Sequence, residues 1–261
     1  MHRRTIRGIA ATCGIVFVLA ASVLIGIDGY GKGRRIYGAT GAIRDRQIVK
    51  RMVNSPVDAY RLWKDAGYRG RTVLYIAEKW ETFDPGELIP AQMYRAYPLQ
   101  LYNTARLLEE EHLSGVTFLY VAAMNGISRE ILSIVPEAEI VRMKDAARKV
   151  KNFRVDGRGV YISRQGFPRI FTTAAAFTGV AEPVLVYVGA SYFNYGNPDE
   201  LYRQLVAARV QTDCIVLCAE EGKGSVTRND LDKLAAFARL IGMPPPSIGP
   251  DRSPGPLRQA S

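Results

Sequence analysis

Histidine is nearly absent from this sequence of 261 residues, which contains only His2 and His112. A zinc site built from two or three histidines is therefore excluded. A serine-histidine-aspartate triad would have to use His112, and no G-x-S-x-G motif presents a serine, so acyl-transfer hydrolysis is disfavoured. Cysteine is also scarce. Cys214 and Cys218 would lie about 13 Å apart along one strand, too far to pair with each other, so we expect two buried thiols.

Acidic residues are scarce at the start of the chain. Residues 1–52 contain ten Lys and Arg but only two Asp, whereas the rest of the chain contains 25 basic and 23 acidic residues. The net charge of +10 therefore comes mainly from this leader. A protein that binds nucleic acid needs its basic residues clustered on the folded domain. We therefore expect no nucleic-acid partner.

Charge is absent from residues 8–27, a run of twenty mostly apolar residues. As a helix this run would be about 30 Å long, the thickness of the hydrocarbon core of a bilayer. A cleavable signal peptide is the alternative, but its apolar region is usually about 7–15 residues long and ends at a small-x-small site. No clean site of this kind follows Ile27. We therefore predict an uncleaved single-pass anchor in residues 1–28, placed in a bacterial inner membrane.

Two indications about the orientation of this anchor conflict. Three basic residues precede residues 8–27 and five follow by position 46, so the positive-inside rule would leave the body in the cytoplasm. The short arginine-rich start instead resembles a bacterial n-region, which would place the body outside. We expect an extracytoplasmic body, with a cytoplasmic body as the alternative.

The remaining composition divides the chain into three further parts. Residues 29–45 are rich in Gly and basic residues and predict a flexible basic linker. Residues 46–243 carry the periodic apolar patterns of a single α/β domain. Residues 244–261 are Pro-rich without an apolar pattern and predict a disordered tail.

Helix starts and buried strands alternate within residues 46–243. Capping residues predict four helices, which begin after Ser55, Asp84, Asn197 and Thr227. Short apolar runs predict four strands, at 72–77, 116–123, 184–190 and 214–219. Residues 153–171 alternate in polarity around two Gly-containing turns, which indicates a hairpin. The pattern predicts a three-layer α/β/α domain with a mainly parallel sheet.

Ligands of open parallel sheets bind beyond the carboxyl ends of the strands, so the residues that follow each predicted strand are the candidate site. Carboxylates in such a crevice could hold a hard cation or perform acid/base chemistry, although solvated loops have the same composition. The nearby sequence EGKGS lacks the spacing of a phosphate-binding loop. The candidate crevice residues are Glu78, Lys79, Glu81, Asn125, Ser191, Tyr192, Asn194, Glu220 and Glu221.

Three segments within residues 55–242 carry a resemblance to a known superfamily, and the last of them, CIVLCAEEGKG with the helix that follows, would match one of its strand-helix units. SPVDAYRLWKDAGYRGRTVLYIAEKWETFDPGE resembles the start of an arginase- or deacetylase-like metallohydrolase domain, and VLVYVGASYFNYGNPDELY resembles a later strand of that superfamily. The resemblance implies metal ligands at the positions that here hold Ala77, Lys79 and Glu81 in the first segment, and Gly189 and Ser191 in the second. Of these side chains only that of Glu81 could still bind a metal ion.

The sequence therefore predicts a membrane-anchored domain that keeps the frame of such a hydrolase without its metal ligands. We expect no catalysis, no metal and no cofactor, and a small ligand or a protein partner bound in the crevice. The alternative is an anchored hydrolase or transferase that uses the crevice carboxylates, with Lys79 as their charge partner.

Overall fold

The computed structural model describes the residues in seven ranges. These ranges are 39–78, 109–110, 113–147, 153–156, 159–164, 167–220 and 224–243. The expected anchor (1–28), the expected helix after Asp84, His112 and the expected tail (244–261) lie outside them. None of the helices within these ranges combines the length and the apolar character needed to cross a bilayer.

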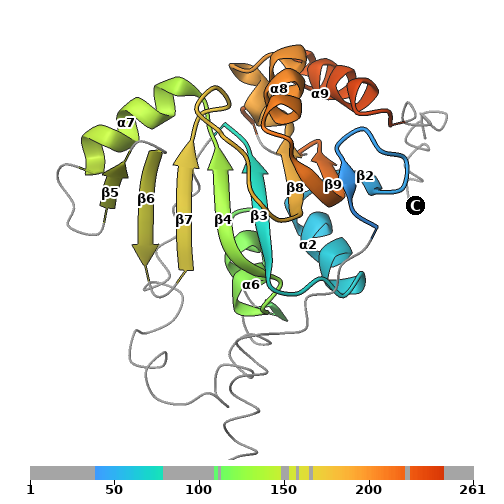
Figure 1. Ribbon diagram of the computed structural model, residues 1–261, viewed down its shortest axis with the longest axis horizontal. Helices are drawn as coiled ribbons and strands as arrows, with labels where there is room; N and C mark the ends of the chain where they lie inside the picture. The colour runs from blue at the N-terminus through green and yellow to red at the C-terminus, as the bar shows by residue number, and fades with distance from the viewer. Residues whose placement is uncertain are drawn as a thin grey trace, which may run out of the picture.

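A single mixed sheet of nine strands organises the domain, in the order β1-β9-β8-β3-β4-β7-β6-β5, with β2 also paired to β9 (Figure 1). The strands β2, β9, β8, β3, β4 and β7 pair in parallel, whereas β1, β6 and β5 pair antiparallel. The strand bounds are β1 Gly41–Ala42, β2 Val49–Val53, β3 Arg71–Ile76, β4 Ser128–Ile134, β5 Phe153–Asp156, β6 Gly159–Arg164, β7 Phe167–Thr172, β8 Val184–Gly189 and β9 Gln211–Cys218.

Helices cover both faces of this sheet. Their bounds are α2 Pro56–Asp65, α6 Phe118–Met124, α7 Glu137–Ala147, α8 Pro198–Ala207 and α9 Arg228–Leu240. The expected caps begin three of them: Ser55 precedes α2, Asn197 Oδ1 accepts the N–H groups at the start of α8, and Thr227 forms a capping box with Asp230 before α9. Each cap satisfies N–H groups that have no partner within the helix.

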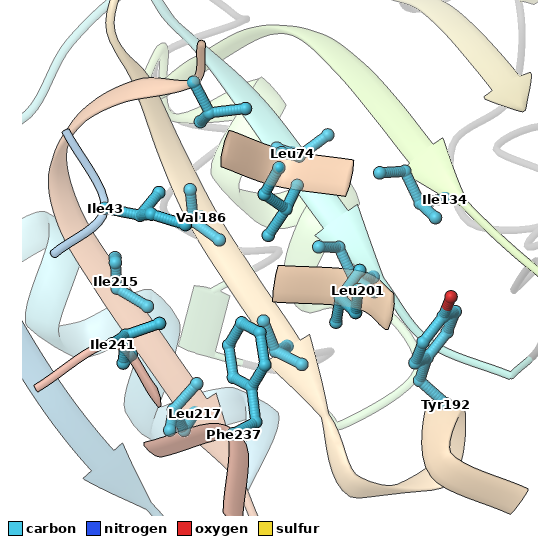
Figure 2. Packing of buried hydrophobic residues seen from close by; sticks show 14 of the residues in the cluster. Ile43, Leu74, Ile134, Val186, Tyr192, Leu201, Ile215, Leu217, Phe237 and Ile241 are labelled. Carbon is cyan, nitrogen blue, oxygen red and sulfur yellow. The ribbon is translucent and has the colours of Figure 1, made fainter. Parts of the chain in front are cut away.

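Alternation of side chains along the strands separates the two main hydrophobic clusters, and a smaller third cluster lies between α7, β6 and β7. Leu74 and Ile76 of β3 face α8 and α9, in a cluster that Figure 2 shows from close by. Val73 and Tyr75 of the same strand face α2 and α6. Because neighbouring side chains of a strand point to opposite faces, both faces of β3, β8 and β9 are apolar, as in sheets covered on both sides.

The prediction of a strand at 116–123 is wrong, because Phe118–Met124 forms helix α6. Asn125 and Gly126 end the helix. Gly126 has a positive φ of 69°, and its N–H donates to the Ala123 carbonyl while the Ile127 N–H donates to the Ala122 carbonyl. This Schellman arrangement is a helix stop signal. The helix is buried along almost its whole length, so it has no polar face to distinguish it from a buried strand.

The folded domain also contains strands that the apolar pattern does not reveal. Strand β4 begins with the polar residues Ser128, Arg129 and Glu130, and the edge strand β2 is VKRMV. Strand β1 lies within residues 29–45, expected as linker, and Ile43 beside it is buried. The expected strands at 72–77, 184–190 and 214–219 are present as β3, β8 and β9. The expected hairpin is present as β5, β6 and β7, with β7 joined to β4.

Candidate functional site

The direction of the strand order reverses at the neighbouring strands β3 and β8. From β3 the chain continues to β4 and β7 on one side, and it then returns to β8 and β9 on the other side of β3. Helix α6 follows β3 on one face of the sheet, whereas α8 follows β8 on the opposite face. Such a reversal opens a crevice at the carboxyl ends of the two strands, where open α/β sheets bind their ligands.

Three of the expected site residues meet at this point: Glu78 after β3, Ser191 after β8 and Glu220 after β9. The Glu78 backbone N–H donates to Ser191 Oγ over 3.3 Å. The Ser191 backbone N–H donates to Glu220 Oε2 over 2.7 Å. Ser191 therefore links the ends of three parallel strands. We call Glu78, Gly189, Ser191 and Glu220 the strand-end cluster.

Gly189 provides the space in which the Glu220 carboxylate lies. A Cβ at position 189 would be 2.7 Å from Glu220 Oε2 and 2.8 Å from its carboxyl carbon. Glu220 itself has a φ of 53°, a left-handed conformation that is uncommon for a residue other than Gly. The backbone turn thus directs the carboxylate back over the end of β8. In the sequence, the close approach of the Glu220 carboxylate to the end of β8 is indicated only by the glycine at the end of this buried strand.

Both carboxylates of the cluster are withdrawn from solvent, with exposed fractions of 7% for Glu78 and 2% for Glu220. Glu220 is held by Ser191. Glu78 Oε2 is buried without a hydrogen-bond partner in the part of the chain that the structure describes. A buried polar atom of this kind is costly for folding and is often found at a functional position.

The surroundings of the cluster are apolar and aromatic. Burial raises the pKa of the Cys218 thiol, at the end of β9, to about 12. Burial also raises the pKa of the Tyr187 hydroxyl well above its ordinary value, with Cys218 and Glu220 adding to the shift. Both groups therefore stay protonated at neutral pH. Cys218 is not a thiolate and so is not an activated nucleophile.

Tyr192 and Asn194 lie in the 3₁₀ helix η1 (Ala190–Asn194), where they act as structural side chains. Tyr192 belongs to the core beneath α8 and lies near Leu201 in Figure 2; burial, with a contribution from Glu200, raises its pKa to about 12. Asn194 Nδ2 donates to the Ser225 carbonyl over 3.0 Å. These residues hold the loop around the cluster.

Asn125 does not belong to the crevice, so this part of the predicted site is wrong. It caps the end of α6, and its Nδ2 donates to the Val121 carbonyl. The adjacent Gly126 carbonyl accepts the Gly70 N–H, one residue before β3 begins. Asn125 is therefore at the amino end of β3, about 20 Å of strand away from Glu78. The error follows from reading α6 as a strand.

The other expected site residues, Lys79, Glu81 and Glu221, lie outside the described residues. Within the described ranges, no group of three or more His, Cys, Asp and Glu side chains is placed to hold a metal ion. The cluster itself offers two carboxylates, one of which already accepts a backbone N–H.

No protein-family model and no curated protein matches this chain. The class of the protein therefore follows from its fold and site alone. It is an α/β domain with a mixed nine-stranded sheet and a buried pair of glutamates at its switch point.

Proposed function

We propose that this chain is a membrane-anchored, non-catalytic relative of the arginase- and deacetylase-like hydrolases, and that it binds a small ligand or a protein partner. The observation that carries the proposal is the position of the Glu220 carboxylate. It fills the space above Gly189, where the resemblance would place the side chain of a metal-binding aspartate.

The geometry at Gly189 explains why a metal-binding arrangement does not fit. An aspartate at this position would need a Cβ within 2.7 Å of Glu220 Oε2, closer than non-bonded carbon and oxygen atoms approach. Glu220 Oε2 is also engaged by the Ser191 N–H. The carboxylate thus ties β9 to β8 and closes the end of the crevice, a structural use that leaves it poorly placed to hold a divalent cation.

Metal content and metal-dependent stability test this proposal directly. We expect the purified full-length chain to contain no stoichiometric manganese, zinc or iron by inductively coupled plasma mass spectrometry. Its melting temperature should stay constant when Mn²⁺ or Zn²⁺ is added, because a ligand stabilises a fold only in proportion to its binding. A rise of several degrees, absent in Glu220→Gln, would overturn the proposal.

A second candidate function is an anchored hydrolase or transferase that uses Glu78 and Glu220 as its acid and base, with Glu81, Glu221 and Lys79 as further charged groups. The favouring observation is Glu78 Oε2, which is buried without a partner in the described part of the chain. Carboxyl groups withdrawn from water often perform acid/base chemistry. Turnover of a phosphate-ester, carboxylic-ester or amide substrate that Glu78→Gln abolishes, without loss of folding, would support this function.

Membrane attachment through residues 8–27 is a separate part of the proposal, with the body on the outer side of a bacterial inner membrane. It is supported by the twenty uncharged residues of this run. Deleting residues 1–28 should move the protein from the membrane fraction to the soluble fraction. A protease added to intact spheroplasts should digest the body of the full-length chain, whereas protection of the body would indicate the cytoplasmic orientation.

A further inference from the structure

Strand β5 forms one edge of the nine-stranded sheet, next to helix α7 (Figure 1). It pairs antiparallel with β6, and no other strand in the described part of the chain pairs with it. Alternate residues of an edge strand direct their backbone N–H and C=O groups away from the sheet, where another strand can pair with them. The edge at β5 is therefore a candidate binding surface for an extended segment of chain.

The face of β5 on the side of α7 is apolar. Val155 pairs with Val160 of β6, and Val160 belongs to the buried cluster that includes Ile140 and Met143 of α7. Val155 itself is 46% exposed. The apolar layer beside α7 therefore continues to the outer edge of the sheet, where its last side chain is open to solvent.

The other face of β5 carries two charges of opposite sign. Arg154 Nη2 donates to Asp156 Oδ2 over 3.2 Å, and the Arg154 guanidinium lies 5.8 Å from the centre of the Tyr161 ring on β6. The side chains of Arg154 and Asp156 nevertheless have exposed fractions of 75% and 37%. Contacts within the hairpin thus hold the two charges on the outer strand, where a further partner can reach them.

The charge pattern of β5 is complementary to itself. Arg154 comes one residue before Val155 and Asp156 one residue after it. If a second β5 lies antiparallel with Val155 opposite Val155, each Arg154 lies opposite the Asp156 of the other copy, at a Cβ–Cβ distance of about 4.5–5.5 Å. A parallel copy in register would oppose like charges, which is destabilising. A shift by one residue would place each Val155 opposite a charged residue, so the pattern favours a single register.

The opposite edge of the sheet lacks this pattern. Strand β2 has the sequence VKRMV, in which Lys50 and Arg51 are adjacent and carry the same charge. A second β2 centred on Arg51 would oppose like charges in either direction. Charge on this edge therefore disfavours pairing with a copy of itself, as is common for edge strands of natural proteins.

We propose that two copies of this chain associate through β5, with a two-fold axis at Val155, so that their sheets join into one continuous sheet. The four charges of the two Arg154–Asp156 pairs alternate in sign on one face, and the two Val155 side chains meet on the other. The axis is normal to the sheet, so both α7 helices lie on the same face. Such an isologous interface is closed, and association therefore stops at the dimer. The dimer does not depend on the ligand or the membrane attachment proposed above.

Disulfide cross-linking tests the geometry of this interface. The full-length chain with Cys13→Ser is the background, because Cys214 and Cys218 are buried. Opposite residues of antiparallel strands have Cα atoms about 4.5–5.5 Å apart, which suits a disulfide. We expect Val155→Cys to form a covalent dimer on mild oxidation, whereas Val206→Cys on α8, where the valine is 47% exposed, should stay monomeric. Equal cross-linking of both variants, or none in Val155→Cys, would overturn the proposal.

Charge exchange tests the register. Arg154→Asp opposes two acids across the interface and Asp156→Arg opposes two arginines, so each variant alone should weaken the dimer by about tenfold or more in sedimentation equilibrium. An equimolar mixture of the two variants should restore it, because position 154 of each copy then faces the opposite charge at position 156. Mixing cannot restore a general loss of folding. A monomeric wild-type chain at sub-millimolar concentration, or a mixture that associates no better than its components, would overturn the proposal.

Discussion

The strand-end cluster and a pocket against β4 and β7 lie on one sheet but differ in what fills them. At the cluster, the Glu220 carboxylate occupies the space above Gly189 and accepts a hydrogen bond from Ser191. At the pocket, a cavity of about 230 Å³ remains, and the hydroxyl of the lining residue Thr172 is buried without a hydrogen-bond partner among the described residues. Within the described residues, the Glu220 side chain thus fills the space above Gly189 at the end of β8, whereas open space remains between β4, β7 and the connection from β7 to β8.

The difference has a simple structural origin. Helices α8 and α9 cover β8 and β9 with large apolar side chains. Over β4 and β7 the cover is the connection from β7 to β8, whose residues 176–181 line the remaining cavity. Four predictions test this contrast between a filled site and an open one.

The largest expected effect comes from adding a methyl group at Gly189. In Gly189→Ala the new Cβ would lie 2.7 Å from Glu220 Oε2, so the carboxylate must move and lose its bond to Ser191. We expect the free energy of unfolding, from urea denaturation, to fall by about 3 kcal/mol. Gly224→Ala is the control, since no atom of the described residues, apart from its chain neighbours, lies within 4 Å of the added Cβ. Equal stability of the two variants would show that the cluster is not tightly filled.

The two glutamates of the cluster should respond differently to loss of charge. Glu220→Gln weakens a charge-assisted hydrogen bond to the Ser191 N–H and should lower the free energy of unfolding by about 1–2 kcal/mol. Glu78→Gln removes no hydrogen bond of the side chain within the described residues, so we expect a change within about 0.5 kcal/mol. Chemical denaturation of both variants measures the contrast. A larger loss of unfolding free energy in Glu78→Gln than in Glu220→Gln would show that Glu78, and not Glu220, is the carboxylate that stabilises the cluster.

The open pocket predicts a gain in stability when its buried hydroxyl is removed. Thr172→Val replaces an Oγ1 that has no hydrogen-bond partner among the described residues with a methyl group of similar size, so the free energy of unfolding without ligand should rise by up to about 1 kcal/mol. Thr212→Val is the matched control, because Thr212 Oγ1 donates to the Val184 carbonyl over 2.6 Å and its loss should destabilise the fold. A loss of stability in Thr172→Val would indicate that the hydroxyl has a partner.

The smallest effect at neutral pH concerns the buried thiols of β9. Burial raises the pKa of Cys214 and of Cys218 to about 12, whereas an unfolded thiol titrates near about 8.5. The unfolded state therefore loses protons first, and stability that is fully present below about pH 8.5 falls as the pH rises towards 12. Chemical denaturation from pH 7 to 11 measures this decline. In the double variant Cys214→Ala, Cys218→Ala, the free energy of unfolding should decline less steeply with rising pH. An equally steep decline would show that the two thiols do not cause the loss of stability.

Local chemistry accounts for the elements that the sequence predicts well. Ser55, Asn197 and Thr227 begin helices α2, α8 and α9 because capping interactions satisfy N–H groups within four residues. In α2 and α9 the carboxylates of Asp58 and Asp230 complete a capping box. Strands β3, β8 and β9 are recognisable because they are apolar on both faces.

Tertiary context explains the elements that the sequence does not predict. Helix α6 is apolar on nearly all sides because it is buried between α2 and the sheet, and burial on all sides removes the helical period from the sequence. Strand β4 is polar where its amino end reaches the pocket at Glu130. Its membership of the sheet depends on pairing with β3 and β7, which are distant in the chain.

By itself the sequence determined which residues cap the helices, which strands are buried on both faces, and that Glu78, Ser191 and Glu220 follow strands. Only the tertiary structure decided that these three meet, that Asn125 lies at the opposite end of β3, and that Glu220 fills the space above Gly189. The physical reason is the range of the interactions. Caps and periodicity act within a few residues, whereas strand order and close packing join residues that are far apart in the chain, such as Glu78 and Ser191 or Val49 and Cys214, which no local pattern records.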